Sequence, residues 1–212
     1  KSYGSARVNV SDPSNPGPIL GESDVLSQAV AILDEALNDL SYAGSSFSFP
    51  LAGFDGFDTP STFSQFNRAV KAVALVYSGN KSGALTALNS SFFNLSGDLK
   101  TGPKHVFSLS AGDFVNGLYK IIDNNGDQII VHNSFIADAE SGDKRVENKT
   151  IARSDATTQD GLNGTHQTRL YASNISPIDI IRNEELVLLY AEANIPSNSS
   201  EAVKALNVVR NA

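Results

Sequence analysis

The chain contains no cysteine, no methionine and no tryptophan among its 212 residues. Without cysteine there is no disulfide framework, no thiolate metal site and no cysteine nucleophile. Without methionine there is no start residue, so we expect an internal piece of a longer protein that is incomplete at both ends. The sequence has no apolar run long enough to span a bilayer and no visible secretory signal peptide.

Positive charge is also scarce. The 16 Lys and Arg residues are outnumbered by 23 Asp and Glu residues, which gives a formal net charge of −7. Because phosphate binding requires a basic surface, this balance argues against nucleic acid as a partner. With 41% hydrophobic and 18% charged residues, the composition is that of a globular protein rather than a disordered one.

Helical periodicity dominates the two ends of the chain. Apolar residues recur there at spacings of three and four, and Ser23 is the predicted N-cap of the first helix. The predicted helices are 23–40, 61–77, 83–91, 183–194 and 200–210. The sequence therefore predicts a mainly α fold, with a helical scaffold at 23–91 and 181–212.

Two helical hairpins resemble each other in sequence. Residues 66–90 and 181–207 each contain a long helix that ends in small residues, a polar turn, and a helix that closes on Ala-Leu. Small side chains let helices approach closely, as in tetratricopeptide-like repeats. The small residues expected at these contacts are Ala84, Ala87, Ala191 and Ala202. We therefore predict tetratricopeptide-like hairpins.

Residues 92–180 differ from the helical ends because they are rich in Gly, Asn and Asp. We predict a loop-rich insert here with one or two short β-strands. Two apolar runs, 119–122 and 129–132, flank a segment at 123–127 that contains Asn-Gly. An apolar run, an Asn-Gly turn and a second apolar run predict a β-hairpin.

The segment 123–127 also alternates oxygen ligands like the opening of a calcium loop, through Asp123, Asn125 and Asp127. The rest of the pattern does not follow. The loop glycine is fourth rather than sixth, and the twelfth position is Ser134 rather than Glu. A plain turn is favoured, and we predict no metal site.

No catalytic motif is present. The three histidines, His105, His132 and His166, lack metal-ligand spacing, and there is no nucleophile elbow, phosphate loop or dinucleotide fingerprint. Glu184 and Glu185 precede a helical run, where acids interact favourably with the helix dipole. We predict no catalytic residue and no cofactor. A glycosidase pair depends on the separation of two carboxylates in space, which the sequence does not give.

A Gly- and Ser-rich loop between the first two predicted helices concentrates aromatic residues. It contains Phe47, Phe49, Phe54 and Phe57, with the carboxylates of Asp55 and Asp58 beside the last two rings. Aromatic faces with adjacent carboxylates suit the apolar faces and hydroxyl rims of sugars. The alternative is that the rings pin the loop to the core, because Phe lacks the polar group of Tyr or Trp. These six residues are the candidate ligand-binding residues.

Several segments, in this order, resemble the SusD/RagB family of outer-membrane proteins. They are Phe-Asp-Gly-Phe-Asp-Thr-Pro at 54–60 with Phe-Asn-Arg-Ala at 66–69, Phe-Ile-Ala-Asp at 135–138 with Asp-Lys-Arg at 143–145, Pro-Ile-Asp-Ile-Ile-Arg-Asn-Glu-Glu-Leu at 177–186 with Tyr-Ala-Glu-Ala at 190–193, and the helix at 202–210. The resemblance implies one SusD-like domain over residues 1–212. It implies that the matched residues are scaffold, with Arg182, Glu185 and Glu192 holding helices together.

The resemblance also implies a function. Members of the family are surface-exposed lipoproteins of an outer membrane that bind an oligosaccharide, or in some members a peptide, without cleaving it. They act as the lid of a SusC-like TonB-dependent transporter, which would be the partner here. The lipid anchor would lie outside this sequence. Two alternatives remain: a tetratricopeptide-type protein-interaction scaffold, and a hydrolase.

Overall fold

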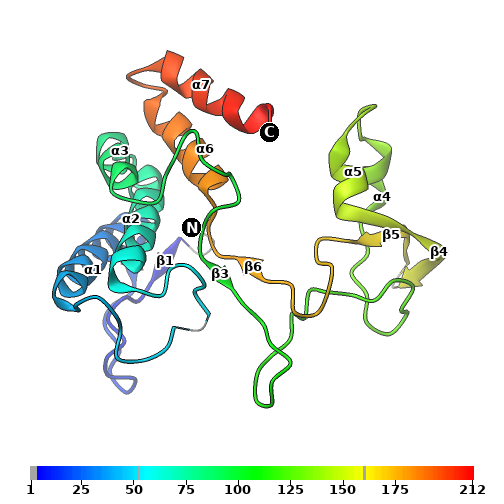
Figure 1. The fold of residues 1–212 in the computed structure, drawn as a ribbon, viewed down its shortest axis with the longest axis horizontal. Coiled ribbons are helices and arrows are strands. Elements are labelled where there is room, and N and C mark those ends of the chain that lie inside the picture. Colours follow the sequence, from blue (N-terminus) through cyan, green and yellow to red (C-terminus); the bar gives the residue numbers. More distant parts are fainter. Residues whose placement is uncertain (1–3, 52, 160) are drawn as a thin grey trace. The chain divides into compact units, whose positions relative to one another are not determined.

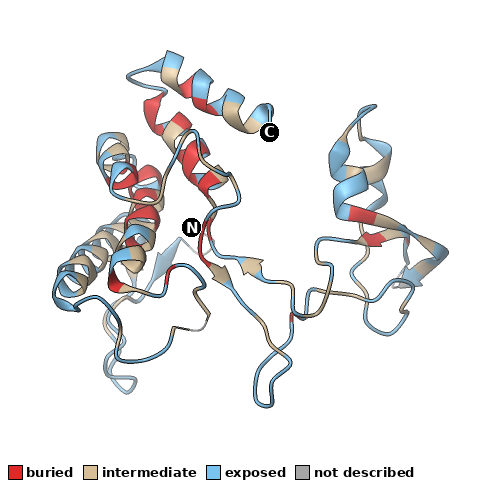
Figure 2. Ribbon diagram, in the orientation of Figure 1, coloured by how far each residue is buried: buried red, intermediate tan, exposed pale blue. Residues whose placement is uncertain are grey.

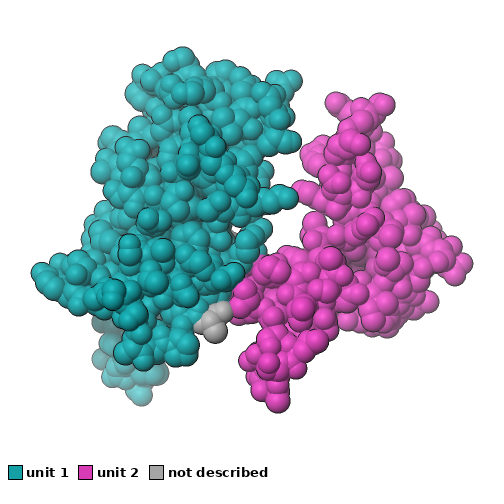
Figure 3. Space-filling view, viewed as in Figure 1, with its two compact units in different colours: residues 1–104, 179–212 teal, residues 105–178 magenta. Residues whose placement is uncertain are grey.

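The computed structural model of the protein describes residues 4–51, 53–159 and 161–212. The described part is rich in helix and contains three two-stranded sheets (Figure 1). The chain divides into two compact units (Figure 3). Unit 1 comprises residues 1–104 and 179–212, and unit 2 comprises residues 105–178. The prediction of a helix-rich fold is confirmed at this level.

Unit 1 contains the long helices. They are α1 (Glu22–Tyr42), α2 (Pro60–Tyr77), α3 (Lys81–Asn89), α6 (Asn183–Asn194) and α7 (Ser199–Arg210). The strand β1 (Ser5–Ala6) pairs antiparallel with β2 (Leu20–Gly21) before α1. The strand β3 (Lys104–His105) pairs with β6 (Ile178–Asp179) where the chain leaves and re-enters unit 1.

The start of α2 follows from its local sequence. The Thr59 side chain accepts a hydrogen bond from the Thr62 amide, and the Thr62 hydroxyl accepts one from the Thr59 amide, each at 3.2 Å. This reciprocal capping satisfies two amides that the helix leaves free. Pro60 occupies the first helical position, where no backbone donor is needed.

The other helix ends agree with the predicted bounds to within two residues, with one correction. The predicted N-cap Ser23 is wrong, because α1 begins at Glu22 and its N-cap is Gly21. Asn80 caps α3, which starts two residues earlier than predicted. Glu184 and Glu185 lie in the first turn of α6, as the helix-dipole interpretation requires.

The core of unit 1 is built largely from small residues at helix contacts. Figure 2 shows the buried residues concentrated on α2, α3, α6 and α7. The small residues expected there are all buried, with exposed fractions of 0% to 4%: Ala84, Ala87, Ala191 and Ala202. Leu88 and Leu186, both 0% exposed, join Ala84 and Ala87 in one cluster with Ala69 and Ala72 of α2, and Ala191 belongs to a second cluster with Val187 and Ala205. The burial predicted for these small residues is therefore confirmed.

Ion pairs connect the helices at the edge of this core. The buried guanidinium of Arg68 on α2 donates to Asp34 Oδ1 on α1 at 2.7 Å, and Lys71 Nζ donates to the same carboxylate at 2.6 Å. The hydrogen bond from Lys71 and the bond and charge of Arg68 lower the pKa of Asp34. The Asp34 carboxylate thus joins α1 to α2 in its charged form.

The scaffold residues implied by the family resemblance have three different environments. Glu192 accepts from Lys81 Nζ at 2.5 Å, which connects α6 to the start of α3. Among the described residues, Arg182 pairs with neighbours in the sequence, Glu184 at 2.5 Å and Asp179 at 3.8 Å. The side chain of Glu185 is exposed. Of the three, Glu192 is the residue that joins two helices.

A loop from Ser90 to Pro103 is fixed to the start of α6 by Asn183, which is 1% exposed. Its Oδ1 accepts from the Asn94 amide at 2.9 Å, and its Nδ2 donates to the Asn94 carbonyl at 2.7 Å. Gly102 lies so close to the backbone just before α6 that an added Cβ would be 2.0 Å from the carbonyl oxygen of Ile181. A glycine is therefore required at position 102.

The hairpin predicted at 119–132 is wrong. Residues 119–128 form turns without strands, and Ile130 makes a single isolated bridge with Gln167. Asp123 adopts a φ of 62°, a left-handed conformation that Asp tolerates. Its carboxylate accepts from the Ser154 amide at 2.9 Å and the Ser154 hydroxyl at 2.5 Å, so the turn attaches to another segment.

The hairpin of unit 2 is formed instead by β4 (Thr150–Gln159) and β5 (Leu162–Thr168), which pair antiparallel. The sequence between these strands is Asp160-Gly161, a dipeptide typical of tight hairpin turns. Two short helices precede the hairpin, α4 (Asn133–Ala137) and α5 (Lys144–Lys149). Asp143 caps α5, and the Arg145 guanidinium lowers the pKa of that carboxyl to about 2.

Unit 2 has a polar interior. Among its described residues no hydrophobic side chain is buried, whereas Gln167 is 0% and Asn116 is 1% exposed. Gln167 Oε1 accepts from Arg153 Nη1 at 2.8 Å and from the Asp123 amide at 3.1 Å, and Nε2 donates to the Ile121 carbonyl at 3.3 Å. Hydrogen bonds therefore define this interior.

Candidate ligand-binding surface

The aromatic loop, residues 43–59, begins where α1 ends and runs to the N-cap of α2. Two turns shape its second half: the Phe54 amide donates to the Leu51 carbonyl at 3.0 Å, and the Phe57 amide donates to the Phe54 carbonyl at 2.8 Å. These turns bring successive rings of the loop toward the first half of α2. Backbone hydrogen bonds thus help to hold the described part of the loop, in addition to its side-chain contacts.

Three of the four predicted phenylalanines join one ring cluster with α2. Phe47 packs edge-on against Phe63 with centroids 5.9 Å apart, and Phe54 contacts Phe63 at 5.6 Å and Phe66 at 5.9 Å. Phe49 stacks on Phe47 at 5.4 Å with an interplanar angle of 25°. The offset and edge-on geometries are those that aromatic pairs favour.

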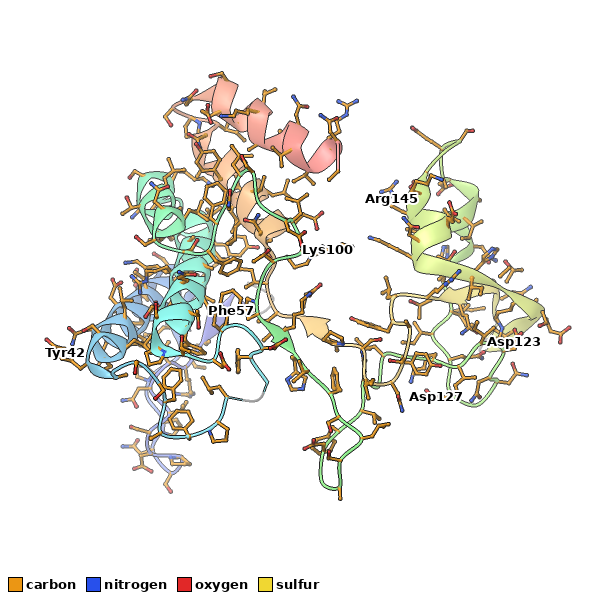
Figure 4. The ribbon with its side chains drawn as sticks, in the orientation of Figure 1. Tyr42, Phe57, Lys100, Asp123, Asp127 and Arg145 are labelled. Carbon is orange, nitrogen blue, oxygen red and sulfur yellow. The ribbon has the colours of Figure 1, made fainter. Side chains whose placement is uncertain are left out.

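Phe57 belongs to a different contact. Its side chain, labelled in Figure 4, is 7% exposed. The ring packs edge-on against Phe92, from the segment after α3, with centroids 5.0 Å apart. A ring buried in this way has no free face for a ligand. We therefore assign Phe57 to loop packing and leave it out of the candidate surface, as one of the two sequence interpretations anticipated.

The outer part of the cluster is accessible. Phe49 is 57% exposed, and Phe47 is partly exposed beneath it. The side chains of Asp55 and Asp58 are exposed on the same loop. We call the stacked pair Phe47 and Phe49 the aromatic surface. It offers an apolar ring face on a loop that also carries two hydrogen-bond acceptors.

Two members of the cluster, Phe63 and Phe66, were not among the predicted site residues. Both lie on α2 at a spacing of three, which places them on one helical face. They are also the first aromatic residues after the loop in the sequence. The combination of helical spacing and proximity to an aromatic loop was the pattern that could have identified them as the support for Phe47 and Phe54.

The side-chain oxygen atoms of the segment at 123–127 accept hydrogen bonds from other groups of the protein. Asp123 is bonded to Ser154, Asn125 Oδ1 accepts from Arg153 Nη2 at 2.6 Å, and Asp127 pairs with Lys120 at 2.5 Å. Figure 4 labels Asp123 and Asp127 in this part of unit 2. Among the described residues, no group of three or more His, Asp or Glu side chains is placed to hold a metal ion. These hydrogen bonds and ion pairs form a network that attaches the segment to the rest of unit 2.

A groove in unit 1 lies among α1, α2 and α3. It encloses about 440 Å³, and its lining includes Arg68, Lys71 and Thr86. Both cations in this groove are already paired with Asp34. Most of its lining is apolar and includes Val30, Leu37 and Leu75, so unit 1 has a groove in addition to the exposed aromatic surface.

No helix in the described ranges has the length and apolar character needed to cross a membrane. Comparison of the chain with models of protein families, with curated proteins and with solved structures found no match.

Proposed function

We propose that the protein is a non-catalytic binding protein of the SusD/RagB type, which captures an oligosaccharide for uptake through a SusC-like TonB-dependent transporter. The proposal places it at the outer membrane as a surface-exposed lipoprotein whose anchor lies outside this sequence. The observation that carries the proposal is the aromatic surface, in which Phe49 is 57% exposed and stacked on Phe47.

The helical arrangement supports the proposal. The hairpins α2–α3 and α6–α7 resemble each other in sequence, and α3 and α6 both contribute to one core. We interpret these pairs as tetratricopeptide-like units, in which small residues such as Ala84 and Ala202 permit close helix contact. In such a scaffold the helices are rigid and the connecting loops are free to carry a ligand.

The chemistry of the surface also supports a sugar ligand. The C–H face of a sugar ring can lie on the exposed ring of Phe49, while carboxylates such as those of Asp55 and Asp58 accept from hydroxyl groups. No catalytic sequence motif accompanies these residues. A ligand held in this way would be bound and released without bond cleavage.

Calorimetric titration with a panel of neutral oligosaccharides tests the proposal. We expect binding without release of new reducing ends, and we expect Phe49→Ala to weaken it by about tenfold, because an exposed stacking face is lost. Phe114→Ala is the matched control, since Phe114 is 83% exposed and lies in unit 2. It should leave binding unchanged.

Three outcomes would contradict the proposal. Release of reducing ends would identify a hydrolase. An equal effect of Phe49→Ala and Phe114→Ala on sugar affinity would show that the aromatic surface is not part of the binding site. The absence of binding to every sugar would reject carbohydrate capture.

Peptide binding is the second candidate, and the groove among α1, α2 and α3 favours it. A groove of about 440 Å³ that is flanked by helices, largely apolar, and edged by polar side chains such as Arg68 and Thr86 suits an amphipathic peptide. A peptide library screened beside the sugars separates the two candidates. Peptide binding without sugar binding would support a peptide-binding member of the family or a protein-interaction scaffold.

A further inference from the structure

The groove among α1, α2 and α3 is built from one stripe of residues on each helix. α1 and α3 both pack against α2. The lining residues of α2 recur at spacings of three and four, and those of α1 lie two turns apart, so each set faces one side of its helix. They are Ser64, Arg68, Lys71 and Leu75 on α2, and Val30 and Leu37 on α1. The stripe of α3 reaches from Asn80 to Ser90, a length of about 15 Å at about 1.5 Å per residue.

The apolar side of this groove is only partly covered. α1 is amphipathic, yet no residue of this fully described helix is buried. Val30 and Leu37 line the groove and keep part of their surface exposed, and Leu75 and Ala87 lie deeper among the buried residues. Covering an apolar helix face with another apolar element is favourable, because it removes the exposed surface from water.

The charged residues that line the groove are both cationic. Arg68 and Lys71 share one carboxylate, that of Asp34, so one positive charge is in excess. The side chain of Lys71 is 19% exposed and that of Arg68 is 8% exposed, so Lys71 is the more accessible cation. Lys71 Nζ donates to the two oxygens of Asp34 at 2.6 and 2.8 Å, and an ammonium group has a third proton to donate. In a protein with a net charge of −7, this groove complements an acidic side chain.

The backbone of the groove limits the conformation of a ligand. Its walls are helices, in which the backbone donors and acceptors are paired within each helix. The hydroxyl groups of Ser64 and Thr86 also donate to carbonyl groups of their own helices, at 2.7 and 3.2 Å. An extended peptide would therefore bury backbone groups without partners, whereas an α-helical peptide pairs its own.

We propose that the groove binds an acidic amphipathic helix of a partner protein. The apolar face of that helix covers Val30 and Leu37, and an Asp or Glu side chain on the same face accepts a hydrogen bond from Lys71 Nζ. The inference rests on the peptide candidate of the proposed function, because the groove is the same, and it does not require sugar capture.

The experiment uses the whole chain and three synthetic helical peptides, each of about 14 residues, which is enough to span the groove. The first has Leu at spacings of three and four with one Glu on the Leu face. The second has Gln in place of that Glu, and the third has a central Pro that breaks the helix. In fluorescence polarisation we expect the first peptide to bind about fivefold more tightly than the second, because the ion pair is lost, and the third not to bind. Added salt should reduce this difference.

Two pairs of variants locate the binding site. Lys71→Gln keeps a donor but removes the charge, so it should weaken the Glu peptide about fivefold and leave the Gln peptide unchanged. Lys204→Gln on α7, at a side chain that is 61% exposed, is its matched control. Leu37→Ala should weaken both peptides about threefold, whereas Ile32→Ala, at an exposed position of the same helix, should weaken neither. Melting curves verify that every variant is folded.

The outcomes distinguish this inference from sugar capture. Binding of the Glu peptide that Lys71→Gln and Leu37→Ala weaken supports the groove as a site for an acidic helix. Equal affinity for the Glu and Gln peptides, binding of the Pro peptide, or binding that both variants leave intact overturns it. Absence of binding to all three peptides also overturns it, and the oligosaccharide titration then still decides sugar capture by itself. A protein that binds the Glu peptide in the groove but no sugar keeps this inference and loses sugar capture.

Discussion

At the scale of single residues, the strongest constraints are polar groups with several partners. Asn183 exchanges hydrogen bonds with Asn94, Gln167 organises the interior of unit 2, and Asp34 serves two cations. Each group is fixed because removing one partner leaves another buried group unsatisfied. The aromatic residues of the loop fall into two groups: Phe57 is buried by packing against the core, and Phe49 keeps a solvent-accessible ring face.

The charge of Asp34 is expected to contribute to stability in a pH-dependent manner. Asp34→Asn should lower the free energy of unfolding by about 1 kcal/mol at neutral pH, because the side chain of Arg68 is only 8% exposed and loses its charged partner. The Asp34 pKa is lowered from 3.8 by folding. The contribution is therefore complete above the unfolded pKa and disappears as the pH falls through the lower folded pKa.

Urea unfolding measured from pH 7 downward checks this expectation. The difference between the unaltered protein and Asp34→Asn should shrink below about pH 4, the ordinary range of an aspartate. Asp39→Asn, at an exposed position of the same helix, is the control and should have little effect. A difference that stays constant with pH would contradict the role of the charge.

At the scale of elements, local sequence chemistry explains most helix ends, whereas strand pairing depended on distant contacts. Pro60, Asn80 and Asn198 set their helix starts within a few residues. The apolar runs around 119–132 had a hairpin pattern, but Asp123 bonds to Ser154 and directs the chain elsewhere. The polar strands β4 and β5 lack a clean alternation, and the Asp-Gly dipeptide between them was the better local indication.

The close approach of Gly102 to the backbone of Ile181, just before α6, provides a prediction at this scale. Gly102→Ala would place a Cβ 2.0 Å from the Ile181 carbonyl oxygen, and the backbone must move to avoid it. That movement would strain the bonds from Ile180 to Pro103 and from Asn183 to Thr101. We expect a loss of about 3 kcal/mol in the free energy of unfolding.

Thermal and urea denaturation measure this loss. Gly117→Ala is the matched control, because an added Cβ there meets nothing within 4 Å and no positive φ opposes it. Equal stabilities of the two variants would mean that the chain around position 102 rearranges without cost.

At the scale of the whole molecule, the two units differ in what holds them together. Unit 1 has buried Ala and Leu side chains from four helices, whereas the buried side chains described in unit 2 are polar. Apolar burial is the larger source of stability, and a hydrogen bond contributes less because water competes for its partners. The two units should therefore open with different free energies.

Native-state hydrogen exchange on the full chain measures this difference. The amides of α2, α3 and α6 should exchange slowest, and those of β4 and β5 should exchange faster, because the hairpin opens without exposing an apolar core. Uniform protection across both units would contradict a separate, less stable unit 2.

The sequence by itself determined the helical ends of the chain, the small residues at their contacts, and the absence of cysteine chemistry. Periodicity, capping and side-chain size act over a few residues, so their effects can be predicted without knowledge of distant segments. Only the tertiary structure decided that Phe57 is buried and Phe49 exposed, that Asp34 joins two helices, and that Gln128 Oε1 is buried without a hydrogen-bond partner among the described residues. Burial and long-range hydrogen bonding depend on which segments meet, and that information is not contained in any local pattern.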